Sequence, residues 1–304
     1  MKKDLFGKPA TKRMESILVF HDERRYGKEW LYHGLLAIPV ENFKDVLQGL
    51  NLCRDSAKYY RELHFCKITE EKYSNKIKLA REWIKYFRNK YYNAGYLYFF
   101  GVCCQNINYD VFGDSKDKRS QKDFRIYNRF FEMALFSMLR FFFKNQDKVT
   151  VSEIFSHASD RPGEDPFPHH PIYKIKKRKV KNIHIDTSRV TQISSNHEKE
   201  DAYSSESQCI QFIDCIIGSI GQVLDCSSKK ECFVELADLM LPLVREITSN
   251  QYNWRSDYYK RYILNFFPRK ALEVKEIYSE PRPAMFFYKR NLKLTNKDQL
   301  DFGF

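Results

Sequence analysis

Short apolar runs and amphipathic stretches alternate along most of this chain. The run at 17–20 (Ile-Leu-Val-Phe) is rich in β-branched and aromatic residues and predicts a buried strand. The apolar run at 30–40 predicts a second strand, and the basic segment 24–28 between the two resembles a hairpin connection. Further strands are predicted at 96–104, 149–156 and 190–193.

Apolar residues spaced three and four apart predict the helices. This spacing indicates helices at 42–52, 77–91, 124–143 and 208–224. After residue 228 the pattern is mostly helical, with a turn near 248–250 and a second helical stretch ending near Phe267. The order of elements predicts an α/β fold. We expect a basic arm at 1–13, one domain at 14–227 and a mainly helical extension at 228–304.

The charge balance indicates a polyanionic partner. The 304 residues include 52 Lys and Arg against 39 Asp and Glu, a formal net charge of +13. An excess of this size is typical of proteins that bind nucleic acid. A lysine-rich genome would produce the same excess without such a partner, so charge alone leaves both interpretations open.

The cysteines and the apolar stretches predict a cytoplasmic protein. None of the eight cysteines forms a Cys-x-x-Cys pair, and Cys226 and Cys232 lack His or Cys company at zinc spacing. Reduced thiols are the rule in the cytosol. The longest apolar stretches are interrupted by Asp214 and Pro242, so we expect no membrane-spanning helix.

Four acids stand where a plain core would not need them. Asp22 ends the first predicted strand, Glu62 lies in a short Glu-Leu-His-Phe segment, Asp160 follows the strand at 149–156, and Asp214 interrupts an apolar helix. Buried carboxylates need a cation as partner, and a salt bridge or helix cap is the plain alternative for each. Gathered carboxylates suit Mg²⁺ or Mn²⁺, and two such ions support phosphodiester cleavage.

The order of these motifs resembles a known family. The pieces are Phe20-His21-Asp22-Glu23, Glu62-Leu63-His64, Asp160, and Ser207 followed by Gln211-Phe212-Ile213-Asp214. Together, over about residues 15–225, they resemble the bacterial and phage domain of unknown function catalogued as number 3800. The resemblance implies an RNase H-like fold, a mixed sheet flanked by helices, and a metal-dependent nuclease. Glu23, His64 and Gln211 are secondary candidates within its motifs.

The sequence departs from the family pattern in two places. Arg24 and Arg25 follow the Asp-Glu pair, where the family has small residues. These arginines could bind phosphate bidentately or mark a site with a changed use. The helix has Gln-Phe-Ile-Asp in place of Gln-Leu-Ala-Asp, while a Leu-Ala-Asp string occurs later at Asp238. We prefer Asp214 because the neighbourhood of Asp238 lacks the Ser and Gln.

Basic and histidine residues supply further candidates. The densest basic segment predicts a nucleic-acid patch or, equally, a solvated helix face, and consists of Lys174, Lys176, Lys177, Arg178, Lys179 and Lys181. His157 and the pair His169-His170 could reach the site, but plain structural or loop roles are as open to them.

These features lead to two hypotheses. The first is a Mg²⁺- or Mn²⁺-dependent nuclease, with Asp22, Glu62, Asp160 and Asp214 as catalytic metal ligands and nucleic acid as substrate. By analogy with the family, its role would be that of a defence effector or toxin, with a regulatory subunit or a second copy as partner. The second is a protein of the same fold that binds nucleic acid or a partner without catalysis.

Overall fold

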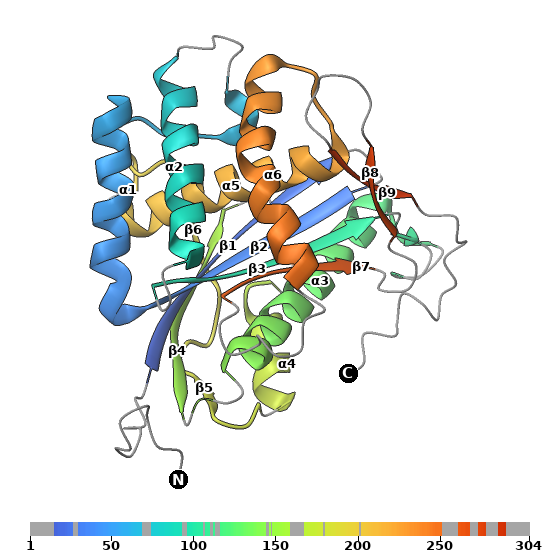
Figure 1. The fold of residues 1–304 in the computed structure, drawn as a ribbon. Helices are drawn as coiled ribbons and strands as arrows, with labels where there is room; N and C mark the ends of the chain where they lie inside the picture. The colour runs from blue at the N-terminus through green and yellow to red at the C-terminus, as the bar shows by residue number, and fades with distance from the viewer. Residues whose placement is uncertain are drawn as a thin grey trace, which may run out of the picture.

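Figure 1 shows the computed structural model of the chain. The structure describes residues 15–26, 30–68, 74–92, 96–105, 107–109, 112, 116–143, 146, 148–158, 167–178, 180–200, 202–250, 261–267, 273–277 and 285–289.

One mixed sheet forms the centre of the molecule. Its strands are β1 (Glu15–Tyr26), β2 (Trp30–Pro39), β3 (Tyr98–Gln105), β4 (Val149–His157), β5 (Ile183–Ile185), β6 (Thr191–Ile193) and β7 (Tyr262–Phe267). The spatial order is β5-β4-β1-β2-β3-β7. β5 pairs with the first residues of β4, and β6 pairs with the last residues of the same strand. A separate two-stranded hairpin consists of β8 (Glu273–Ile277) and β9 (Met285–Lys289).

The strand directions define the fold. β1, β2 and β3 form an antiparallel meander, whereas β4 lies parallel to β1 on its other side and β5 lies parallel to β4. The order 3-2-1-4-5 with these directions is that of the RNase H-like fold, and it confirms the predicted mixed α/β architecture. Beyond this order, β7 adds a parallel strand to the free edge of β3.

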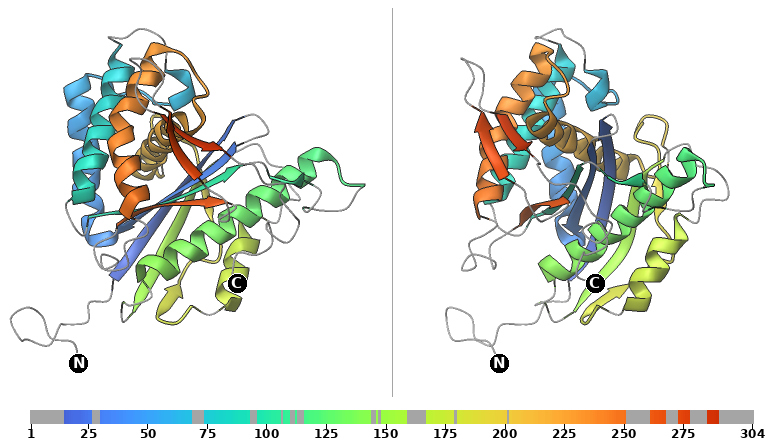
Figure 2. Two further views of the ribbon diagram at one scale, coloured as in Figure 1. Left: turned by 45° about the vertical axis from the view of Figure 1, so that its right-hand side comes forward. Right: turned by 90° about the vertical axis from the view of Figure 1, so that its right-hand side faces the viewer.

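Helices cover both faces of the sheet (Figure 2). On one face lie α1 (Phe43–Ala57), α2 (Asn75–Tyr92), α5 (Ser204–Asp225) and α6 (Glu231–Asn250). On the other lie α3 (Arg119–Phe143) and α4 (His169–Arg178). Two single 3₁₀ turns, η1 (Val40–Asn42) and η2 (Phe65–Lys67), flank α1 and the segment after it. We call the first face the α5 face and the second the α3 face.

Alternation along β1 decides which side chains meet the helices of each face. Phe20 belongs to the core of the α5 face, whereas Ile17 and Val19 belong to the core of the α3 face. The next residue in step with Phe20 is Asp22, which therefore points to the α5 face. His21 points the other way and lies against Tyr127 and Phe131 of α3.

Three stretches differ from the sequence-based expectations, and one of them is 248–250, which belongs to α6 where a turn was predicted. β1 runs four residues past Asp22 to Tyr26, so Arg24 and Arg25 lie within a strand and not in its connection to β2. Residues 262–267, expected to end a helix, form β7. The alternation of Tyr262 and Leu264 toward one core and Ile263 toward the other is the strand period, and the unpaired edge of β3 gives this strand its partner. The extension after residue 228 therefore contains one described helix and three strands.

α5 is the central helix of the α5 face. Among the described residues it alone is long and apolar enough to cross a membrane, by length and composition. In the structure 89% of that apolar window is buried inside the protein, as expected of a helix in the core of a folded domain.

Candidate functional site

The parallel pairing of β1 and β4 places an acid beside a histidine. The register pairs Phe20 with Phe155 and His21 with Ser156, so Asp22 and His157 come next, on neighbouring strands. Strand alternation turns both side chains toward the α5 face. His157 Nδ1 lies 3.6 Å from Asp22 Oδ1.

A second acid and histidine approach from the helices of the same face. Asp214 projects from α5, and its Oδ2 accepts a hydrogen bond from the backbone N–H of Phe65 at 2.8 Å. The same oxygen lies 3.5 Å from His64 Nδ1, while His64 Nε2 lies 2.8 Å from Glu62 Oε1. The segment between α1 and η2 thus brings Glu62 and His64 to the acid of α5.

Ser195, which follows β6, joins the two halves. Its buried hydroxyl donates to Glu62 Oε1 at 2.6 Å. Ser195 Oγ also lies 3.2 Å from His64 Nε2 and 3.2 Å from His157 Nε2. We call the resulting connected set the acid–imidazole cluster, and it consists of Asp22, Glu62, His64, His157, Ser195 and Asp214.

Burial and charge perturb the titration of the cluster. Burial, with Asp214 adding its negative charge, raises the pKa of Asp22 to about 6 against the opposing hydrogen bond to His157. The hydrogen bond to Asp22 raises the pKa of His157 to about 9 against the desolvation of its ring. Partial burial opposes ionisation of Glu62, but the hydrogen bond from Ser195 and the charges of His64 and Lys67 lower its pKa.

Gln211 and Arg54 hold the segment that carries Glu62 and His64. Gln211, one helical turn before Asp214, is fully buried, and its Oε1 accepts from Leu63 N–H at 2.8 Å and from Arg54 at 2.9 Å. Its Nε2 donates to the Ser195 carbonyl at 2.5 Å. Arg54 also donates to the Arg61 carbonyl at 3.0 Å. One side chain of α5 therefore fixes the backbone on both sides of the cluster.

A glycine lets the same segment lie close to α5. A Cβ added to Gly218, one turn after Asp214, would meet the Phe65 ring at 2.2 Å. Such a distance is far inside van der Waals contact, so the buried Phe65 ring occupies space that only glycine leaves open. This close approach keeps Phe65 N–H within reach of the Asp214 carboxylate.

The structure brings together part of the predicted site. Asp22, Glu62, His64 and Asp214 belong to the cluster, and Gln211 lies behind it. Asp160 lies outside the described residues. Glu23 follows the strand alternation to the α3 face, where Tyr127 OH donates to its Oε2 at 3.2 Å. Asp238 lies on α6, and desolvation, then the charge of Glu235, raises its pKa to about 6.

The two arginines after Asp22 have protein partners. Arg24 donates to the Gly218 carbonyl and, at 2.5 Å, to Ser227 Oγ, and it lies 3.4 Å from Asp225 Oδ2. Arg25 forms an ion pair with Asp123 of α3. The guanidinium of Arg24 is thus engaged at the C-terminal end of α5, where it stabilises the helix, and we do not include it in a phosphate site.

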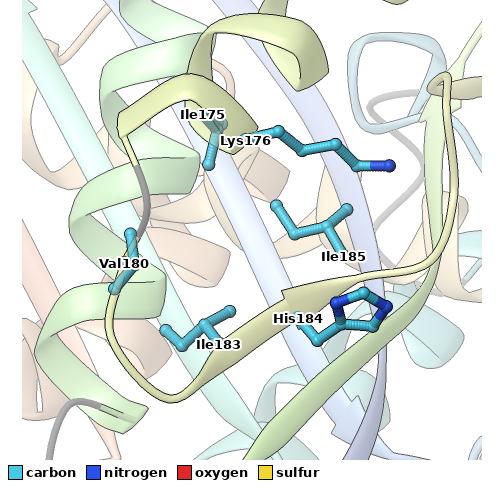
Figure 3. Close-up of a pocket in the computed structure, with 6 residues that line it drawn as sticks. All are labelled: Ile175, Lys176, Val180, Ile183, His184 and Ile185. Carbon is cyan, nitrogen blue, oxygen red and sulfur yellow. The ribbon is translucent and has the colours of Figure 1, made fainter.

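The basic segment of α4 lies away from the cluster. α4 packs on the α3 face, where Arg178 and Lys174 lie 2.6 and 3.5 Å from Glu132 oxygens. Lys176 lines a largely apolar cavity of about 300 Å³ beside β5, with Ile175, Val180 and Ile183 (Figure 3). β5 pairs with β4 at 149–151, about 20 Å along the strand from His157. Lys177 and Lys181 are part of the same region, and Lys179 lies outside the described residues.

Ser195 is the member of the cluster that the sequence did not indicate. It follows a three-residue strand in a polar stretch, and nothing in its neighbours distinguishes it from a loop serine. His157 was a candidate in the sequence only because it follows the strand predicted at 149–156 and lies close to Asp160. The parallel register of β1 and β4, which puts it beside Asp22, is a property of the fold and not of either local sequence.

The donors fit a hard divalent cation by their chemistry. The carboxylates come from β1, from α5 and from the segment between α1 and η2. Carboxylate oxygens are the ligands that Mg²⁺ and Mn²⁺ prefer. Within the part of the chain that the structure describes, no group of three or more such donors is already arranged around one point. The carboxylates are instead linked through His64, His157 and Ser195, which lie between them.

Comparisons with known proteins leave the strand order as the basis of the fold assignment. No protein-family model and no curated protein matches the chain. Among solved structures, a chain from the PCNA:RNase HII complex of Archaeoglobus fulgidus is similar at 10% identity, with a TM-score of 0.29, over 75% of this chain and 88% of that one.

Proposed function

We propose that this protein is a metal-dependent hydrolase of phosphodiester bonds in nucleic acid. The observation that carries the proposal is the meeting of three carboxylates, Asp22, Glu62 and Asp214, from separate parts of the chain at one end of the sheet. Such a group repels itself unless cations neutralise it. The net charge of +13 suits a polyanionic substrate and supports the same assignment.

The residues in and behind the cluster have different roles in the proposed reaction. Asp22, Glu62 and Asp214 would hold Mg²⁺ or Mn²⁺, which activates water and stabilises a leaving oxygen in phosphodiester hydrolysis. His157 and His64 lie within hydrogen-bond range of Ser195 and next to these acids, where an imidazole can deliver a proton to a departing alkoxide. Gln211 keeps the segment carrying Glu62 in place.

The test is a cleavage assay with Asp214→Asn. The amide keeps the shape of the side chain and can still accept from Phe65 N–H, but it loses the charge that holds a cation. We expect cleavage of labelled DNA or RNA with Mn²⁺ to fall by at least about a hundredfold. Glu206→Gln, which removes an acid from the first turn of the same helix outside the cluster, is the matched control and should cleave normally.

Unchanged cleavage by Asp214→Asn would contradict the proposal. The absence of cleavage in wild-type protein, with nucleic acid bound, would favour a non-catalytic binding protein on the same fold.

A second candidate is a hydrolase with Ser195 as nucleophile. Ser195 Oγ lies 3.2 Å from His157 Nε2, and the other nitrogen of that ring lies 3.6 Å from Asp22, which is the connectivity of a Ser-His-Asp triad. Glu62 competes with this arrangement, because its Oε1 accepts the hydrogen bond of the Ser195 hydroxyl at 2.6 Å. EDTA separates the candidates, because only the metal-dependent reaction stops when the ion is removed.

A further inference from the structure

A pocket of about 340 Å³ opens beside the acid–imidazole cluster. Glu62 and His64 belong to both, so whatever fills the pocket touches the cluster directly. The other walls come from the segment between α1 and α2, from the start of α2, and from Asn196 and Glu198 after β6. The side chains that matter below are Tyr59, Arg61, Glu62, His64, Lys67 and Lys76.

The pocket carries cations that form no ion pair with any residue that the structure describes. Arg61, Lys67 and Lys76 line it, and none of the three has an ion-pair partner among the residues that the structure describes. Arg24, Arg25 and Arg178, in contrast, are each paired with a carboxylate. Glu62 and Glu198 are the acids of the lining, so three cations face two carboxylates, one of which is engaged by Ser195.

One wall of the pocket is a fixed aromatic ring. Tyr59 is half-buried, and its hydroxyl donates to the Glu62 carbonyl at 3.0 Å, which holds the ring beside the cluster. Asn196, which follows β6, also lines the pocket. Its side chain is oriented by a hydrogen bond that its Oδ1 accepts from Glu198 N–H at 3.1 Å. An aromatic side chain next to cationic side chains that can contact phosphates is the combination with which proteins hold single-stranded nucleic acid.

We propose that this pocket receives one unpaired nucleotide next to the scissile phosphodiester, its phosphate bound by Arg61, Lys67 and Lys76 and its base against Tyr59. The volume lies at the small end of ligand pockets and accommodates one nucleotide, whereas a base pair within a duplex is too wide to enter. The inference rests on the proposed function in one respect, the scissile bond at the cluster. It makes the substrate a single strand or a strand with an unpaired end or loop.

The experiment measures binding without reaction. Fluorescein-labelled oligothymidylate of about ten nucleotides and a blunt-ended, fully paired duplex of the same charge are titrated with protein in EDTA, with anisotropy as the readout. The test variant is Lys67→Ala/Lys76→Ala. The matched control is Lys44→Ala/Lys78→Ala, which removes the same charge from exposed positions of α1 and α2 outside the pocket.

We expect the test variant to bind the single strand about tenfold more weakly than wild type and the control variant to bind it within about twofold. The slope of log affinity against log salt should fall by about 1 to 2 in the test variant alone. Circular dichroism confirms that both variants are folded. Equal losses in the two variants, or equal losses for the fully paired duplex and the single strand, would overturn the pocket assignment.

The outcome is independent of catalysis. If the pocket variant loses single-strand binding but wild-type protein never cleaves, the proposed hydrolase fails and the nucleotide pocket stands. If wild type cleaves in Mn²⁺ and the pocket variant cleaves with unchanged KM, the hydrolase stands and the nucleotide pocket fails.

Discussion

Asp22 and His157 show how a pair of side chains couples the cluster to pH. The hydrogen bond to Asp22 raises the pKa of His157 from 6.5 to about 9, so the folded protein holds this proton more tightly than the unfolded chain does. The resulting stabilisation is complete below pH 6.5 and disappears as pH rises through 9. Burial disfavours the ionised form of Asp22 and raises the pKa of its carboxyl group to about 6.

Replacing His157 by Gln should therefore cost stability at low pH only. We expect a loss of about 1–2 kcal/mol in the free energy of unfolding at pH 6.5, shrinking toward zero by pH 10, from urea titrations in EDTA. The control is His184→Gln, because His184 lies 2.9 Å from Asp186 in an exposed pair that contributes little to stability. A loss that stays constant from pH 6.5 to 10 would contradict the pairing.

At the scale of elements, the site depends on one side chain of α5. Gln211 bonds Leu63 N–H, Arg54 and the Ser195 carbonyl at once, so it ties α1 and the segment after it to the segment that follows β6. Gln211→Ala removes a hydrogen-bond partner from each of these groups, although Arg54 keeps its bonds to Gln208 and to the Arg61 carbonyl. We expect a loss of about 2–3 kcal/mol in the free energy of unfolding and a lower kcat, because Glu62 and Ser195 lose their common support.

Gln208→Ala is the control for that experiment. Gln208 lies on the same helix and accepts from the same Arg54 at 3.1 Å, but it does not bond Leu63 or Ser195. Its loss should cost less than about 1 kcal/mol and leave kcat unchanged. If the two variants behave alike, Gln211 does not position the cluster.

The elements also show what the sequence could predict. Apolar periodicity located the strands of the meander, β4 and the helices α1, α2, α3 and α5, and an acid among apolar neighbours pointed to Asp214, because these signals are local. The length of β1 was not local, since residues 23–26 remain in the strand through pairing with β2. Nor was β7, which depends on the open edge of β3. Ser195 joins the cluster only through the pairing of β6 with the end of β4.

At the scale of the whole molecule, the sheet separates two charged surfaces. The pocket and the cluster lie on the α5 face, whereas the basic segment at α4 lies on the α3 face. A nucleic-acid strand bound at the cluster would therefore lie beside Arg61, Lys67 and Lys76 and not beside the basic segment of α4. The density of cations in the sequence at 174–181 did not reveal this, because charge along the chain carries no information about which face a helix covers.

Helix α6 and strand β7, which follow residue 228, complete the core of the α5 face. Leu236, Met240 and Val244 of α6 are fully buried in it. Tyr262 of β7 stacks on Phe87 with ring centroids 4.3 Å apart, and its hydroxyl donates to the Phe87 carbonyl at 2.9 Å. A chain that ends at residue 227 would expose the apolar surfaces of α2 and α5 that these side chains cover.

Each large apolar side chain buried this way contributes about 1.5–3 kcal/mol, and a domain is stable by only about 5–15 kcal/mol in total. We therefore expect a chain ending at residue 227 to aggregate or to unfold without a cooperative transition. A chain ending at Phe267, which keeps α6 and β7, should unfold cooperatively in thermal denaturation followed by circular dichroism. A soluble 1–227 fragment with a sharp transition would show that the boundary predicted at 227 separates two domains, and that α6 and β7 are attached to the core without being part of it.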